Sequence, residues 1–174
     1  HFNADATNHE KIEEMVAAIE DQIGEGKIKV LLHSIAKGNL KTMVEPPEGL
    51  NVEYPSNKLG SSDFTLTTDN MAFSIVPWVN ALLTKKLFAS KSRVIALTSA
   101  GDYKIWRGYA AVAAAKAALD AIIKYIAIEY AHLGINANLI EAGVTVTASM
   151  QMIPGSDQII NDLKSKHPKG QLTQ

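Results

Sequence analysis

The fold is decided by the stretch Ser99-Ala-Gly-Asp-Tyr-Lys-Ile-Trp-Arg-Gly-Tyr109-Ala-Ala-Val-Ala-Ala-Ala-Lys116, which joins two segments of different character. The run before it, Arg93-Val-Ile-Ala-Leu-Thr98, is short, apolar and without alternation, which predicts a buried parallel strand. Residues of roughly 108–133 are rich in alanine and predict a long helix. Because open α/β sheets bind ligands at the carboxyl ends of their strands, Ser99 and the start of this helix predict a ligand crevice.

The spacing of Tyr109 and Lys116 favours a site on one face of that helix. The two residues are seven apart, which is about 700° of rotation and within ~20° of two full turns. Both side chains then project from the same face, about 10 Å apart along the axis. A tyrosine there can donate a hydrogen bond to an oxygen that becomes anionic, and a lysine can hold a hydroxyl-bearing ligand.

Three motifs together resemble the short-chain dehydrogenase/reductase superfamily, and most of all its enoyl-acyl-carrier-protein reductase branch. Tyr109 and Lys116 fit the Tyr-x6-Lys pattern of that branch. Most other members carry Tyr-x3-Lys, and in place of that tyrosine this chain has Val112, which can neither donate nor accept a proton. His33-Ser-Ile-Ala36 is similar to the segment after the family's fourth strand. Glu141-Ala-Gly-Val-Thr-Val-Thr147 is similar to its Ser-Ala-Gly-Pro-x-x-Thr segment after the sixth strand.

The chain departs from the branch at two positions. Ser99 stands where many enoyl reductases have a second tyrosine and where ketone-reducing members have their catalytic serine. The choice between an enoyl substrate and a 3-oxoacyl or other ketone substrate therefore stays open, as does a non-catalytic NAD(P)-binding sensor of the same fold. Val144 replaces the usual proline, and this leaves the backbone with one more hydrogen-bond donor.

The resemblance implies one Rossmann-like domain over residues 1–174, with a doubly wound parallel sheet and helices on both faces. It implies hydride transfer from NADH or NADPH to the β-carbon of a trans-2-enoyl thioester in fatty acid synthesis, the thioester being carried by acyl-carrier protein or CoA. It also implies a homodimer or homotetramer, in which the helix containing Tyr109 and the helix before it pack against their copies. The phosphate-binding glycines of the family have no counterpart here, so the sequence reads as an internal portion of a longer chain, incomplete at both ends.

The same resemblance assigns the site residues. The catalytic set is Tyr109, Lys116 and Ser99, with no metal. The cofactor contacts are Asp5, Ser34, Ile35, Ala36, Thr98, Lys116, Ala142, Gly143, Val144, Thr145 and Thr147. The substrate contacts are Tyr103, Trp106, Tyr109, Met150 and Ile153, and Met152 is of the same kind.

For several of these residues a structural explanation stays open. Asp5 is either an adenine contact or a charge at a helix N-terminus. Tyr103 and Trp106 either wall an acyl pocket or are exposed loop aromatics. His33 is better explained as a hydrogen-bonded structural residue than as a base. The irregular segment of residues 37–61 either shapes the substrate entrance or is a solvated insertion.

The remaining elements follow from periodicity and caps. Thr7-Asn-His-Glu10 is a capping-box pattern before a helix that ends at Gly24, and Phe2–Ala6 resembles the end of a strand. A strand is expected over 29–36 and another after Leu133. Ser62 or Asp63 is expected to cap a helix over 64–87 that is kinked at Pro77. Short helices broken at Pro154-Gly155 are expected over 148–166.

Composition narrows the function classes. The 174 residues have 47% apolar and 20% charged side chains and a net charge of −1, which is ordinary for one globular domain. Scattered Lys and Arg leave no electrostatic footprint for nucleic acid, and no apolar run reaches the ~20 residues of a membrane span. The absence of cysteine excludes disulfides and thiolate metal sites, and it fits a cytoplasmic location.

Overall fold

The structure is a computed structural model that describes residues 2, 4–45, 49, 58–151, 153, 155–170 and 172. It contains a parallel three-stranded sheet in the order β1-β2-β3, which confirms the predicted α/β class. The strands are β1 (Ile28–His33), β2 (Phe88–Thr98) and β3 (Ile135–Glu141). The helices are α1 (His9–Ile23), α2 (Ser61–Thr68), α3 (Ile75–Thr84), α4 (Ala110–Glu129), α5 (Ala148–Gln151) and α6 (Ser156–Lys166).

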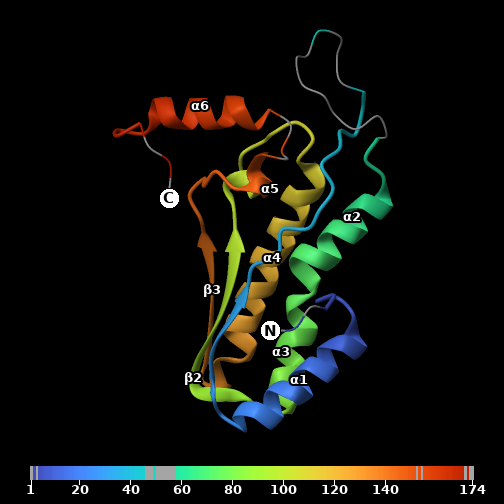
Figure 1. Ribbon diagram of the computed structural model, residues 1–174, viewed down its shortest axis with the longest axis vertical. Coiled ribbons are helices and arrows are strands. Elements are labelled where there is room, and N and C mark those ends of the chain that lie inside the picture. The colour runs from blue at the N-terminus through green and yellow to red at the C-terminus, as the bar shows by residue number, and fades with distance from the viewer. Residues whose placement is uncertain are drawn as a thin grey trace.

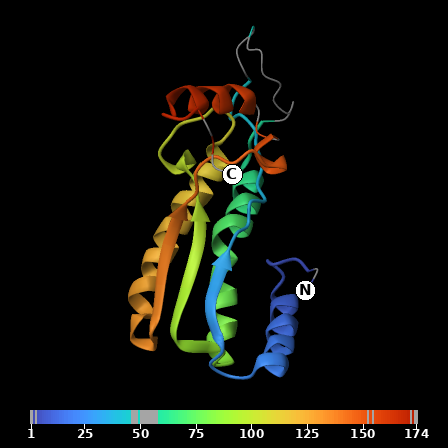
Figure 2. The same cartoon turned by 60° about the vertical axis from the view of Figure 1, so that its left-hand side comes forward.

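The connections place α1, α3 and α4 on the same face of the sheet (Figures 1 and 2). The chain passes from β1 through α2 and α3 to β2, and from β2 through α4 to β3. In the parallel register, His33 of β1 lies beside Ala96 of β2, and Thr98 of β2 lies beside Glu141 of β3. The carboxyl ends of the strands therefore meet at one edge, next to the start of α4.

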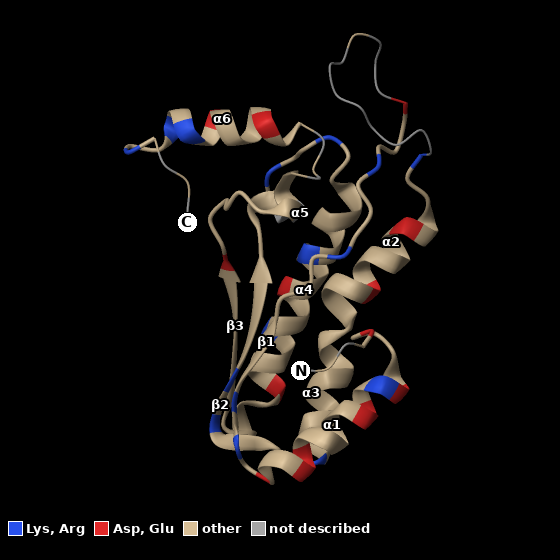
Figure 3. Ribbon diagram, in the orientation of Figure 1, with Lys and Arg blue, Asp and Glu red and all other residues tan. Residues whose placement is uncertain are grey.

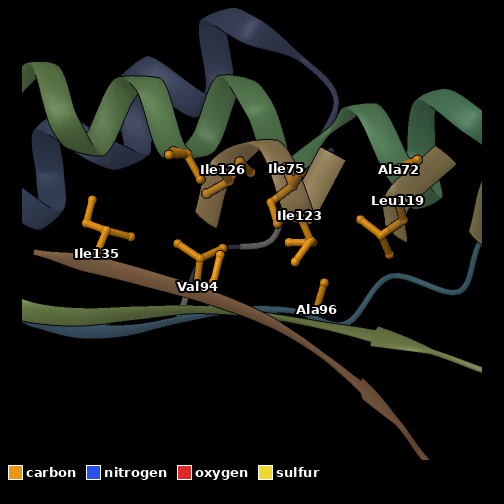
Figure 4. Packing of buried hydrophobic residues seen from close by; sticks show 10 residues of the cluster. Ala72, Ile75, Val94, Ala96, Leu119, Ile123, Ile126 and Ile135 are labelled. Atoms are coloured by element: carbon orange, nitrogen blue, oxygen red, sulfur yellow. The ribbon is translucent and has the colours of Figure 1, made fainter. Parts of the chain in front are cut away.

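The core lies between the helices and the sheet. Val94 and Ala96 of β2 are fully buried beneath Leu119 of α4 and Ile75 of α3, and Ile135 of β3 closes the layer (Figure 4). A second cluster joins α1 to the others by packing Ile12 and Val16 against Leu82 and Leu87. Burying one such aliphatic side chain contributes about 1.5–3 kcal/mol, so these clusters fix the helices on the sheet.

The opposite face of the sheet is open in the described part of the chain. Val30 and Leu32 of β1 and Ile140 of β3 are each about half exposed there, and they alternate with the buried residues of their strands. The family resemblance implies helices on both faces of the sheet. In the described part of the chain, helices cover one face. The second layer stays a prediction.

The first helix and the residues before it differ from the sequence prediction in detail. The N-cap is Asn8, whose side-chain oxygen accepts a 3.1 Å hydrogen bond from the Lys11 amide, so Thr7 lies one residue outside the helix. The helix ends at Gly24 as predicted, with φ at +71°. The predicted strand end at Phe2–Ala6 is wrong for the described residues 2 and 4–6, because no strand lies beside them to complete the pairing.

The predicted continuous helix over 64–87 is divided. Asp63 lies within α2, whose N-cap is Gly60, and a π-helical turn, η1 (Asp69–Phe73), separates α2 from α3. The π-helical turn is identified by the 3.0 Å hydrogen bond that the Ser74 amide donates to the Asp69 carbonyl, five residues back. Pro77 lies in the first turn of α3, three residues after the Ser74 amide that makes this bond, so the irregularity comes before the proline.

Gly134 holds the turn into β3 and gives a stability prediction. Its φ is +78°, and a Cβ there would lie 2.2 Å from the Ser90 carbonyl oxygen, which belongs to rigid backbone. We expect Gly134→Ala to lower the free energy of unfolding by about 3 kcal/mol, because left-handed strain and a backbone clash add. Urea denaturation followed by circular dichroism measures this loss.

Gly26→Ala is the control for that measurement. Gly26 also has a positive φ, +67°, but nothing lies within 4 Å of the added Cβ. Its loss should stay below that of Gly134→Ala, because only the cost of the backbone conformation remains. Equal losses for the two variants would show that the approach of Ser90 to Gly134 has no energetic weight.

Candidate active site

Tyr109 is fixed at the start of α4. It is the N-cap residue, so it stands one position before the helix and not inside it, and its carbonyl accepts a 2.9 Å bond from the Ala113 amide. Its ring meets Trp106 edge-on at 5.4 Å between centroids. A Cβ on Gly101 would lie only 2.2 Å from the ring carbon Cε1 of Tyr109. The ring is therefore held between the Trp106 indole and position 101, where any residue with a side chain would clash with the ring.

Lys116 is buried at the carboxyl end of β2. Its side chain is 6% exposed, and its Nζ donates a 2.7 Å hydrogen bond to the Leu97 carbonyl oxygen. Burial lowers the pKa of Lys116 to about 8, because removal from water disfavours the ammonium. An ammonium has three N–H donors, so the bond to Leu97 leaves capacity for hydroxyl groups of a ligand at this edge.

Two hydroxyls at the end of β2 are buried without a partner among the described residues. They are Thr98 Oγ1 and Ser99 Oγ, and each is shielded from solvent. An unsatisfied buried hydroxyl costs about 1–3 kcal/mol, which a polar ligand at the strand end would recover. Of these groups, Ser99 lines a described cavity together with residues 142–144, whereas Thr98 and Lys116 line none of the described cavities.

A cavity of about 210 Å³ lies between the ends of β2 and β3 and α6, and we call it the α6 cavity. It brings together eight of the predicted site residues: Ser99, Trp106, Tyr109, Ala142, Gly143, Val144, Met150 and Ile153. Ala100, Lys104, Glu141, Ile159 and Leu163 complete its lining. Apart from a few polar groups near Tyr109, the lining is apolar.

A second cavity of about 440 Å³ borders the other side of Tyr109. We call it the loop cavity, because Lys41, Thr42, Met43 and Val44 form one wall. The opposite wall consists of Gly101, residues 104–110 and Ala113. Lys104, Trp106 and Tyr109 line both cavities, so a ligand at Tyr109 has space on two sides.

Other predicted residues lie elsewhere. Asp5 borders an open groove of about 1000 Å³ that is the largest described but does not include Tyr109. Its carboxylate accepts bonds from the Thr7 amide (2.9 Å) and hydroxyl (2.8 Å), which lower the pKa of Asp5. Ser34 and Ile35 line a separate space of about 260 Å³ beside β1, and the structure places Ala36 directly after them.

Three predicted residues have local partners. The Tyr103 hydroxyl donates a 2.7 Å hydrogen bond to Glu141, so its ring joins the loop after β2 to the end of β3. Thr145 lies within 3.5 Å of the Gly143 carbonyl, and Thr147 accepts a 3.2 Å bond from the Met150 amide at the start of α5. Met152 lies outside the described residues.

His33 has a structural environment, as expected. It is 5% exposed, and its Nε2 is 2.8 Å from Ser74 Oγ, which in turn donates to the Asn70 carbonyl at 2.7 Å. Burial, together with the charge of Lys116, lowers the pKa of His33 to about 4, so the ring is neutral at pH 7. It ties β1 to the π-helical turn before α3.

Sequence reasoning missed four residues of the α6 cavity lining that bear on its chemistry. Lys104 and Glu141 carry charges next to Tyr109, and no spacing rule singles them out in an irregular loop. Ile159 and Leu163 of α6 are four residues apart and share a helix face, and that spacing was the available signal. Among the described residues, no cluster of His, Asp or Glu suits a metal ion, and no helix has the length and apolarity of a membrane span.

The fold and the site define a parallel α/β protein with a ligand crevice at the carboxyl ends of its strands, centred on Tyr109. A family profile described as enoyl-(acyl carrier protein) reductase matches residues 1–174. The chain belongs to this family, which confirms the resemblance found in its motifs.

Relatives agree with that assignment. The chain is 30% identical over 169 residues to the NADH-dependent enoyl-acyl-carrier-protein reductase FabI of Bacillus subtilis strain 168, covering 97% of this chain and 60% of that protein. It is 28% identical over 158 residues to the NADPH-dependent FabI of Staphylococcus aureus strain MRSA252, covering 90% and 57%. The chain thus spans about 60% of the length of the curated relatives it matches.

A solved structure shares the fold. The Bacillus cereus enoyl-acyl carrier protein reductase, in complex with NADP+ and an indole naphthyridinone, superposes with a TM-score of 0.77 at 26% identity. The match covers 95% of this chain and 59% of the Bacillus cereus chain.

Proposed function

We propose that the protein is an NAD(P)H-dependent reductase of trans-2-enoyl thioesters, in which hydride adds to the β-carbon of the substrate. The observation that carries this proposal is the α6 cavity, where the Tyr109 ring, the Ser99 hydroxyl and the segment 142–144 meet beside an apolar wall. The names of the relatives support the acyl-carrier-protein thioester as the substrate class, and they support either NADH or NADPH as the cofactor. The proposed pathway is fatty acid synthesis, in the cytoplasm.

The proposed roles are those that the family resemblance implies. Tyr109 donates a hydrogen bond to the thioester carbonyl oxygen as negative charge develops there, and Ser99 is an auxiliary donor. Lys116 holds the ribose hydroxyls, Asp5 meets the adenine, and the remaining cofactor contacts line the strand ends. The nicotinamide, when bound, supplies the hydride. One preorganised donor of this kind is worth about 3–4 kcal/mol of transition-state stabilisation.

The unpartnered Ser99 hydroxyl favours a second candidate, a 3-oxoacyl or other ketone reductase. Assays of the full-length protein with crotonyl and acetoacetyl thioesters, each with NADH and with NADPH, separate the two. We expect crotonyl thioester to be turned over at the higher kcat/KM. Preferential oxidation of cofactor by acetoacetyl thioester would assign the ketone reaction, and turnover of neither would favour a cofactor-binding sensor.

We also propose a homodimer or homotetramer that packs the helices of the β1–β2 connection and α4 against their copies. Support comes from apolar residues exposed on these helices: Leu66, Phe73, Val76, Tyr125 and Ile128. Such residues are normally covered when they gather on one surface. Sedimentation equilibrium should give a mass at least twice that of one chain, and a monomer would refute the proposal.

A further inference from the structure

We propose that Tyr103 and Glu141 act as a positioning pair, whose hydrogen bond holds the loop after β2 in place and thereby orients the Tyr109 ring. The Tyr103 hydroxyl donates this bond to Glu141 Oε1 at 2.7 Å. We call the bond the latch, because it joins the loop of residues 99–109 to the carboxyl end of β3 at the same end of the sheet (Figure 1). The inference rests on the proposed function, since orienting Tyr109 serves catalysis only if its hydroxyl is the donor to the thioester oxygen.

The first argument is that the Tyr103 side chain lies outside the cavities beside Tyr109. It is 61% exposed and lines none of the described cavities, which argues against a contact with the acyl chain. Glu141, in contrast, lines the α6 cavity together with Tyr109. The Tyr103 hydroxyl is therefore connected to the site through the Glu141 carboxylate and through its own loop.

The second argument is that two closed turns connect the latch to Tyr109. The amides of Tyr103 and Lys104 both donate to the Ala100 carbonyl, at 3.3 and 2.7 Å. Farther along the loop, the Tyr109 amide donates to the Trp106 carbonyl at 3.3 Å. Because these bonds tie the backbone at both ends of the loop, a movement of Tyr103 is passed on to Trp106 and Tyr109.

The third argument is that the loop forms one wall of the site that holds the Tyr109 ring. Trp106 meets this ring edge-on at 5.4 Å between centroids. A Cβ on Gly101 would lie 2.2 Å from Cε1 of the Tyr109 ring and 3.2 Å from Cζ3 of the Trp106 indole, so these three groups are closely packed. The ring also packs against a buried cluster formed by Met71, Val112 and Ala115. The direction of the phenol hydroxyl therefore depends on where the latch holds the loop.

The fourth argument is the strength of the latch. Glu141 is the last residue of β3 and is paired in register with Thr98 of β2, so the sheet holds its backbone. A hydroxyl that donates to a carboxylate makes a charge-assisted bond, which is roughly twice as strong as a bond between neutral groups. Figure 3 shows an acidic position at the carboxyl end of β3 and basic positions in the loop before α4, and these opposite charges attract the loop to the strand. The Lys104 ammonium, 5.9 Å from the centroid of the Tyr103 ring, adds a cation–π attraction.

The first test measures turnover by the full-length protein after either partner of the latch has been replaced. We expect Tyr103→Phe to lower kcat with crotonyl thioester about fivefold while KM stays within about twofold, because a misplaced donor is felt in the transition state. Glu141→Leu should lower kcat as well. Because Glu141 also lines the α6 cavity, the decisive variant is Tyr103→Phe/Glu141→Leu, which should be no slower than Glu141→Leu alone. Glu141→Gln keeps an acceptor oxygen and should restore most of the wild-type kcat.

Tyr130→Phe is the matched control for this test. The Tyr130 hydroxyl also donates to a distant side chain, Asn80 Oδ1, at 3.0 Å. Tyr130 lines none of the described cavities, so the loss of its hydroxyl should leave kcat unchanged.

The second test follows the position of the loop without turnover. The described residues include Trp78 and Trp106, and in protein labelled with fluorotryptophan each gives its own fluorine resonance, which Trp106→Phe assigns. We expect Tyr103→Phe and Glu141→Leu each to displace or broaden the Trp106 resonance, because the indole packs on the ring that the latch positions. The Trp78 resonance, from α3, is the internal reference and should not change.

The outcomes separate the latch from the reductase assignment. A rise in KM without a fall in kcat for Tyr103→Phe would make Tyr103 a substrate contact and overturn the positioning role. Losses that multiply in the double variant, or an unchanged kcat, would overturn it as well while leaving the reductase assignment intact. If the wild-type protein turns over no thioester, the reductase proposal fails and the fluorine resonances decide alone. Displacement of the Trp106 resonance by both single variants then supports the latch, and an unchanged resonance overturns it.

Discussion

Replacing Tyr109 with phenylalanine is expected to lower kcat by about 10²–10³-fold while the affinity for the cofactor stays within about twofold. The substitution removes one hydroxyl and keeps the ring. The contacts that hold the ring, its edge-on packing with Trp106 and its fit against Gly101, therefore survive. What is lost is the proposed donor to the thioester oxygen, an interaction that would strengthen only as the oxygen becomes negative. The effect should consequently fall on kcat and not on KM.

Tyr125→Phe provides the matched control for this measurement. Tyr125 lies on the same helix, is 67% exposed and lines neither cavity, so loss of its hydroxyl should leave the kinetics unchanged. Single-turnover oxidation of NADH or NADPH with crotonyl thioester gives the chemical step, and fluorescence titration gives cofactor affinity. If the Tyr109 variant retains wild-type turnover, the tyrosine is no catalytic donor. If wild type and variant both bind cofactor without turnover, the sensor alternative is favoured.

The parts of the site that sequence could predict are those set by strand ends and helix starts. Short apolar runs indicate the strands β2 and β3, and a parallel sheet brings their carboxyl ends together, so Ser99 and Ala142–Val144 were predictable neighbours. The Ala-rich composition indicates α4. The first residue of α4 was not predictable to better than one position. The structure shows that Tyr109 is the N-cap and that the helix begins at Ala110.

The rest depends on long-range contacts that leave no local pattern. Tyr103 donates to Glu141 across 38 positions of sequence, so an exposed loop aromatic becomes a bridge at the sheet edge. The π-helical turn before α3 depends on packing against α4, since every residue in it is compatible with an ordinary helix. The wall of the loop cavity requires Asp63 to accept three bonds, and a single sequence does not reveal which donors will reach it.

Replacing Lys116 with methionine is expected to lower kcat/KM by about 10²-fold, chiefly through weaker cofactor binding. Methionine has a similar length and fits a site that is 6% exposed, so the fold should be retained. What disappears is a charged donor anchored on the Leu97 carbonyl, and one charge-assisted hydrogen bond contributes about 1.5–3 kcal/mol. Fluorescence titration with NADH and NADPH measures the loss. Unchanged affinity would exclude Lys116 from the cofactor site.

The pH dependence makes this test specific to the charge of Lys116. Burial holds the pKa of Lys116 at about 8, so the ammonium is present below pH 8 and is lost as the pH rises through that value. The affinity of the free protein for NADH or NADPH should therefore fall between pH 7.5 and 9. Above the pKa of Lys116, loss of this one proton allows a fall in affinity of ~10-fold per pH unit. Lys116→Arg keeps its charge throughout this range and should lack the decline, whereas Lys116→Met should bind weakly at every pH.

Stability changes in the opposite direction. The unfolded chain keeps the Lys116 proton up to its ordinary pKa near 10.5, so between pH 8 and 10.5 it binds more protons than the folded protein does. This lysine therefore makes the free energy of unfolding rise with pH over that window, while the affinity for cofactor falls. Denaturation of wild type and Lys116→Met at pH 7 and pH 9.5 should show that contribution only in the wild type. A protein in which affinity and stability change together would place the titrating group elsewhere.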